Sequence, residues 1–230
     1  MGSLQARLLE MAPSQYAIAR GVILAHHLIT GLWLMPLDCL HMTVLEVTHS
    51  KTESEIEHLV ALMRDGIPRI TDCPFDHRAR LVKPMLSYDA AAIALSFVPA
   101  AGEASAQTSK TGADTYTYHH LRRDVYALSK KRGVEIASRY TVPSSHLTIA
   151  RFVTQKDVTK HEGQGVDPGR MTELAEGLEA INAELQSQWP KGAGDWIVGE
   201  EKGLDCRKGR LWYGGGQTVH LGKGFVLDEK

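Results

Sequence analysis

The sequence is short of cysteine and of net charge, and each shortage excludes a class of protein. Cys39, Cys73 and Cys206 are widely spaced and include no Cys-x-x-Cys pair, so we expect reduced thiols and no disulfide framework. The 26 basic and 27 acidic side chains give a net charge of −1. A nearly neutral chain has no overall attraction for a polyanion, so we predict no extended nucleic-acid tract and only short nucleotides as nucleic-acid ligands.

Long apolar runs are also missing. The most apolar early stretch, 21–28, is short and contains His26 and His27, and it lacks a charged leader followed by a small-residue cleavage site. We therefore expect neither a membrane span nor a secretion signal. With the reduced cysteines, this favours a cytoplasmic protein, with the nucleus as an alternative.

One short pattern is present twice, as Leu40-His41-Met42-Thr43-Val44 and as His146-Leu147-Thr148-Ile149. Residues i and i+2 of a β-strand share a face, so each copy predicts a strand with an apolar face and a face that carries an imidazole beside a hydroxyl. Composition alone predicts about 0.06 copies with this apolar frame, so two copies are a signal.

The local patterns predict an α+β protein. Ser3–Met11 has helical composition, and 22–34 fits a helix, a strand or one of each. We expect strands at Leu40–Thr48, Ala79–Leu86, Ala91–Val98 and Tyr140–Val153, and helices from Ser50 to Gly66, from Thr117 to Arg132 and from Met171 to Trp189. Two further hairpins are expected, Trp196–Gly199 with Arg210–Tyr213, and Tyr213 across three glycines to Leu221.

The order of these elements predicts how the chain is arranged. At 230 residues it is long enough for one large domain or two small lobes. Strand, helix and hairpin recur after each histidine strand, so we predict one bilobed unit over residues 1–230. It would have two antiparallel sheets related by a pseudo-two-fold axis, helices on the outer faces and the His-x-Thr strands lining a central cleft. The polar segment 99–114 is expected to be a flexible loop, and 156–169 a linker.

The paired residues suit phosphodiester chemistry. An imidazole titrates near neutral pH, so one histidine can act as a base while the other acts as an acid, without a metal. The hydroxyls of Thr43 and Thr148 can donate to the oxygens of a phosphoryl group.

The two motifs resemble those of the two-histidine (2H) phosphoesterases, which include RNA 2′,3′-cyclic phosphodiesterases and 2′-5′ RNA ligase-like proteins. The family pattern is His, apolar, Thr or Ser, apolar, and an arginine often follows the second copy, as Arg151 does here. The resemblance implies His41 and His146 as the catalytic pair, and Thr43 and Thr148 as phosphate donors. It gives Arg151 either a phosphate contact or an ion pair beneath the cleft.

Other residues are more ambiguous. His26-His27 and His119-His120 lack a carboxylate at ligand spacing, so we expect helix surface and no metal site or cofactor. Tyr213 beside Trp212, before three glycines, either stacks on a nucleobase or packs in the core next to a flexible turn. We take Tyr213 as the candidate aromatic substrate contact.

The sequence thus predicts a monomeric, metal-independent phosphodiesterase acting on a nucleoside or short-RNA 2′,3′-cyclic phosphate. One alternative is a module that binds a nucleotide monophosphate without turnover. Another is an RNA-end processing enzyme of the 3′ exonuclease or 2′-5′ ligase type, which would need a longer basic track.

Overall fold

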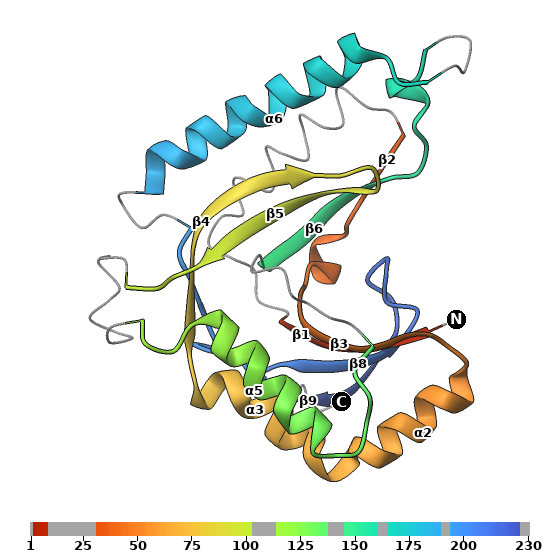
Figure 1. Ribbon diagram of the computed structural model, residues 1–230, viewed down its shortest axis with the longest axis vertical. Coiled ribbons are helices and arrows are strands. Elements are labelled where there is room, and N and C mark those ends of the chain that lie inside the picture. The colour runs from red at the N-terminus through yellow and green to blue at the C-terminus, as the bar shows by residue number, and fades with distance from the viewer. Residues whose placement is uncertain are drawn as a thin grey trace.

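Within the part of the chain that the structure describes, nine strands form one antiparallel sheet, which curls so that the helices lie on its outer side (Figure 1). The computed structural model describes residues 2–8, 31–102, 114–137, 145–160, 165–189 and 194–225. The α+β class predicted from the sequence is confirmed. The strands are β1 (Gly2–Leu8), β2 (Leu32–Leu34), β3 (Met42–Lys51), β4 (Ala79–Tyr88), β5 (Ala92–Pro99), β6 (Ser145–Phe152), β7 (Trp196–Val198), β8 (Asp205–Gly209) and β9 (Gln217–Leu221).

The described helices lie in two groups, one at each end of the sheet. The α-helices are α2 (Glu53–Met63), α3 (Ile67–Asp76), α5 (Tyr118–Lys130) and α6 (Pro168–Gln188), and short 3₁₀ turns are η1 (Leu37–Cys39), η2 (Arg64–Gly66) and η3 (Lys156–Val158). Helix α6 packs on β4, whereas α2, α3 and α5 gather at the opposite end of the sheet, with α5 against β3 (Figure 1).

The sheet has a narrow join at its middle. Its order is β7-β4-β5-β6-β3-β1-β8-β9, and β2 also pairs with β6. Strands β3 and β6 are paired through one residue pair, Met42 with Leu147. We predicted two separate sheets, and the structure corrects this to one continuous sheet that narrows between the two motif strands. The pseudo-two-fold axis stays a prediction.

The strands that follow the first histidine strand do not pair with it. Strand β4 pairs with β5 and β7, and β5 pairs with β6, the second histidine strand. The free edge of β3 is instead occupied by β1, which in turn pairs with β8. The expected recurrence of strand, helix and hairpin as two lobes in chain order is therefore wrong, because segments from the two ends of the chain complete the β3 side.

Three local expectations are corrected. Residues 2–8 form strand β1 rather than a helix, since pairing with β3 and β8 on both edges overrides a weak helical preference. Strand β7 pairs with Ala79–Leu81 of β4, not with 210–213. Strand β9 pairs with β8, which starts at Asp205, so Trp212 and Tyr213 lie in the loop of that hairpin rather than on a strand.

Gly66 does not end the helical region as expected. The Thr52 side chain and Glu55 form a capping box that starts α2, as the sequence indicates. The chain then passes through η2 directly into α3, whose first turn contains Pro68. A β-carbon on Gly66 would lie 2.3 Å from Arg132 Nε, so this glycine allows a close approach between the start of α3 and the end of α5.

Other predicted elements are close to those observed. The hairpin β4–β5, helix α5, helix α6 and the second histidine strand lie within a few residues of their expected bounds. The expected linker contains η3 and a bridge between Thr159 and Val166. Residues 9–30, 103–113, 138–144 and 161–164, including His26, His27 and most of the expected loop 99–114, lie outside the described residues.

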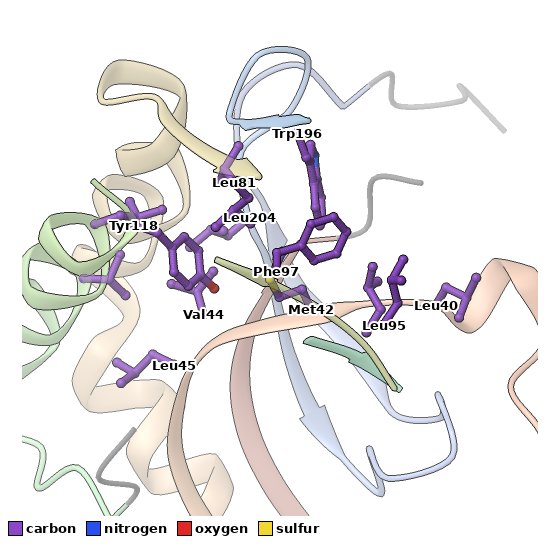
Figure 2. Packing of buried hydrophobic residues seen from close by; sticks show 14 of the residues in the cluster. Leu40, Met42, Val44, Leu45, Leu81, Leu95, Phe97, Tyr118, Trp196 and Leu204 are labelled. Atoms are coloured by element: carbon purple, nitrogen blue, oxygen red, sulfur yellow. The ribbon is translucent and has the colours of Figure 1, made fainter. Parts of the chain in front are cut away.

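The apolar faces of both motif strands belong to one core, and Figure 2 shows Met42 and Val44 of the first motif within it. Met42 is fully buried and Leu147 is 1% exposed, and both belong to the cluster that contains Phe97 and Trp196, whose ring centroids are 5.8 Å apart. Apolar residues of all four described α-helices join this cluster. Because the helices cover the apolar face, the alternate residues of β3 and β6 point to the inner face of the curled sheet.

A buried arginine ties β4 to its surroundings. Arg80 donates to Asp114 at 2.6 Å and to Asp195 at 2.9 Å, and all three side chains are at least nine-tenths buried.

Among the described residues, no helix combines the length and the apolar character that crossing a bilayer requires.

Candidate active site

The two sequence motifs lie side by side in the sheet. Antiparallel strands β3 and β6 pair at Met42 and Leu147, the central residue of each motif. Extending this antiparallel register by one residue in each direction would set His41 opposite Thr148, and Thr43 opposite His146. In that register the two histidines would be diagonal neighbours on one face, and diagonal neighbours in a sheet start about 7–8 Å apart.

Burial confirms the predicted alternation of faces. Met42 and Val44 are fully buried, and Leu147 and Ile149 are each 1% exposed, whereas both histidines and both threonines are partly exposed. The histidines and threonines of both motifs therefore lie on the face that the helices do not cover.

Figure 1 shows how the chain reaches the first motif. The short strand β2 and the turn η1 precede β3, and β2 and β3 lie along the same edge of β6. The η1 turn, which begins after Pro36, connects β2 to β3.

A backbone carbonyl orients the ring of His41. Its Nδ1 lies 2.8 Å from the carbonyl oxygen of Cys39, and since a carbonyl only accepts, Nδ1 carries the proton.

His146 has different surroundings. Burial lowers the pKa of His146 below its ordinary value of 6.5, and the positive charges of Arg122 and Arg151 lower it further, while the carboxylate of Asp89 acts in the opposite direction. The neutral imidazole is therefore the stable form of His146 at neutral pH.

Arg151 returns to the face of the motif because β6 contains a bulge. Ala94 pairs with Thr148 and Ile93 pairs with Ala150, so Ile149 is an extra residue on β6. Ile149 and Ala150 are both buried, and the alternation resumes with Arg151 on the same face as Thr148. The sequence pattern gave no indication of this bulge.

The guanidinium of Arg151 holds the loop of the β8–β9 hairpin. Its Nε donates to the carbonyl oxygen of Trp212 at 3.2 Å, and its Cζ lies 5.0 Å from the ring centroid of Trp212 and 5.7 Å from that of Tyr213. Tyr213 meets Trp33 of β2 edge to face, with centroids 4.8 Å apart. Trp33 lies directly across from Arg151 in the β2–β6 ladder.

Trp212 and Tyr213 are not core residues. Their side chains are 62% and 55% exposed. The interpretation that they pack in the core is therefore wrong, and the loop carries two adjacent aromatic rings on the surface. Trp33, Trp212 and Tyr213, together with Arg151, are called the aromatic corner below.

Two residues beside the motifs were missed by the sequence reasoning. Arg122 of α5 is 7% exposed and donates to the backbone carbonyl oxygen of Thr43 at 3.4 Å. Ser96 of β5 lies directly across from His146, and its Oγ is 2.6 Å from Ser87 Oγ. A signal for Arg122 was present, because it falls in the apolar stripe of α5 at helical spacing from Tyr118 and Val125. Nothing in the pattern singled out Ser96.

The remaining histidine pair takes part in local structure. His120 accepts from the backbone N–H of Thr117 and completes the cap of α5, while His119 is exposed. Among the described residues, no group of three or more His, Cys, Asp or Glu side chains is arranged to hold a metal ion.

Comparisons with known proteins give similarity in fold only. No protein-family model and no curated protein matches the chain. A conserved protein of unknown function from Agrobacterium tumefaciens has a similar fold, with a TM-score of 0.52, 12% identity, and coverage of 96% of this chain and 84% of that one. Usb1 from Kluyveromyces marxianus aligns with a TM-score of 0.47 and 11% identity over 95% and 96% of the two chains. Its complex with uridine monophosphate aligns with the same score and coverage at 12% identity. The chain thus shares its fold with a solved structure to which it has little sequence similarity.

Proposed function

We propose that this protein is a metal-independent phosphodiesterase of the 2H phosphoesterase type, which opens the 2′,3′-cyclic phosphate of a nucleoside or of a short RNA end. The observation that supports the proposal is the pairing of Met42 with Leu147, the central residues of the two motifs, which brings β3 and β6 side by side. Two imidazoles and two hydroxyls around one anion are the groups that a general acid–base displacement at phosphorus uses.

The surroundings of the two histidines suggest their roles. His146 is neutral at neutral pH, because its pKa is lowered by burial and by Arg122, so it serves as the base. His41, whose Nδ1–H is held by the Cys39 carbonyl, serves as the acid through Nε2. A water molecule gives its proton to His146 as its oxygen bonds to phosphorus. One ribose–phosphate P–O bond breaks, and the leaving oxygen takes the proton of His41.

The threonines and the aromatic corner complete the proposed site. The Thr43 and Thr148 hydroxyls donate to the non-bridging oxygens, whose negative charge grows in the five-coordinate transition state. Tyr213 supports the nucleobase, and Arg151, whose Cζ lies 5.7 Å from the Tyr213 ring centroid, supplies a positive charge beside it. The protein is proposed to act as a monomer in the cytoplasm.

Hydrolysis of adenosine 2′,3′-cyclic phosphate in EDTA tests the proposal. We expect turnover without added metal, and we expect His41→Ala and His146→Ala each to lower kcat by at least about a hundredfold, the usual scale for losing a general acid or base. Thr43→Ala and Thr148→Ala should have smaller effects.

His49→Ala is the matched control, because His49 lies on the same strand as Thr43 with its side chain exposed. It should keep full activity. Binding of the nucleotide without hydrolysis would support the alternative of a non-catalytic module, and a strict need for a divalent metal would contradict the mechanism.

A further inference from the structure

The aromatic corner offers more stacking surface than one nucleobase needs. The loop of the β8–β9 hairpin presents Trp212 and Tyr213 in succession, both more than half exposed. Exposed neighbouring aromatic rings are unfavourable in water and are typical of a surface that binds another molecule. Packing in the core therefore does not explain why two aromatic residues stand at these positions.

The loop is held in place rather than free. The Arg151 guanidinium lies over the rings of both residues and its Nε donates to the Trp212 carbonyl. Gly214, with φ +78°, packs so closely on η1 that a β-carbon there would lie 2.3 Å from Cys39 Cβ. Cys39 is two residues from His41, so both aromatic rings have a fixed position beside the first motif.

The two rings differ in their neighbours. Tyr213 is backed by Trp33, which lies on the edge of β6 next to the second motif. Trp212 contacts the guanidinium of Arg151 and is the more exposed of the two residues. Tyr213, which contacts β2 through Trp33, is therefore our candidate for the nucleoside that carries the reacting phosphate, and Trp212 for the next nucleoside.

We infer that Trp212 stacks on the base of a second nucleotide, so that the preferred substrate is a short RNA end of two or more nucleotides rather than a mononucleotide. This inference rests on the proposed function. Arg151 supports it by charge, since its guanidinium lies against both rings and would attract the phosphate that links two stacked nucleotides. The nearly neutral chain limits the contact to a few nucleotides, because it carries no longer basic track.

The test compares kcat/KM for adenosine 2′,3′-cyclic phosphate and for the dinucleotide ApA that ends in a 2′,3′-cyclic phosphate. Stacking on an aromatic side chain is worth about 1–3 kcal/mol per base, so we expect the wild type to favour the dinucleotide about 5- to 150-fold. Trp212→Ala should bring the ratio close to one, and Trp212→Phe should keep most of it.

Tyr126→Ala is the control, since Tyr126 is an exposed aromatic on the helix α5, outside the aromatic corner. It should leave the ratio as in the wild type. Equal rates on the two substrates in the wild type, or a Trp212→Ala variant that keeps the preference, would overturn the inference while leaving the proposed function intact. Absence of turnover on both substrates would overturn both.

Discussion

His41 and His146 occupy matching positions in the two motifs, yet their surroundings differ. The Nδ1 of His41 donates to the Cys39 carbonyl, whereas burial, and then the positive charges of Arg122 and Arg151, lower the pKa of His146. The motif predicted the two residues from sequence, but the asymmetry depends on η1 and α5, which the motif does not contain. The sequence reasoning therefore identified the candidate pair and left the choice of base and acid open.

The lowered pKa of His146 predicts the acidic limb of the pH profile. If neutral His146 is the base, kcat/KM should fall as the pH is lowered, with a midpoint below pH 6.5, the ordinary pKa of histidine. Arg122→Gln removes a positive charge, so the midpoint should move upward, and Arg122→Lys should leave it near the wild-type value. Burial is the larger cause of the shift, so the midpoint in Arg122→Gln should still lie below 6.5.

An acidic limb at the same pH in the wild type and in Arg122→Gln would contradict this account. The free energy of unfolding gives a second measurement, and it should also decrease as the pH is lowered. The unfolded chain binds a proton at His146 more strongly than the native protein does, so His146 lowers the free energy of unfolding as the pH falls below about 6.5.

At the scale of elements, alternation along the strands was predictable, and interruptions of the ladders were not. The faces of Met42, Thr43, Leu147 and Thr148 follow from period-two patterning. The bulge at Ile149 adds one residue without leaving a mark in the pattern, and it decides that Arg151 shares the face of Thr148. The partners of β3 were missed for a related reason, because long-range pairing depends on tertiary packing and not on neighbouring residues in the chain.

The hairpin loop offers a test at this scale. A methyl group on Gly214 would collide with Cys39 and would strain a residue at φ +78°, so Gly214→Ala should displace Trp212 and Tyr213. We expect kcat/KM for a cyclic nucleotide to fall by about 5- to 150-fold, the equivalent of one lost stacking contact.

The Gly102→Ala variant separates the effect of backbone strain from that of the collision with Cys39. Gly102 also has a positive φ, +96°, but a β-carbon there meets nothing within 4 Å. This variant carries the backbone penalty alone and should keep the wild-type kcat/KM. Equal losses in the two variants would mean that the position of the loop does not matter for activity.

For the whole molecule, the buried charges around Arg80 connect segments that are distant in the sequence. Arg80 of β4 pairs with Asp114, which precedes α5, and with Asp195, which precedes β7. Sequence reasoning identified none of these three residues, since isolated charged residues in a strand or loop are usually exposed. Their pairing depends on a sheet order that the sequence did not reveal.

Removing this arginine predicts a large loss of stability. Arg80→Met leaves two carboxylates in the interior without the guanidinium, so the free energy of unfolding should fall by about 3–5 kcal/mol, as measured by urea denaturation. Arg78→Met, at an exposed position two residues earlier, should have little effect. A loss below about 1 kcal/mol in Arg80→Met would show that the cluster contributes no more than a surface ion pair.

Strands β3 and β6 pair only through Met42 and Leu147, and this has a consequence for splitting the chain into two fragments. The proposed site takes one histidine and one threonine from each strand, so a fragment containing one motif would retain only half of it. Cutting the polypeptide between the motifs should therefore abolish the reaction in either fragment alone. Mixing the two fragments should restore activity only to the extent that β3 and β6 pair again at Met42 and Leu147.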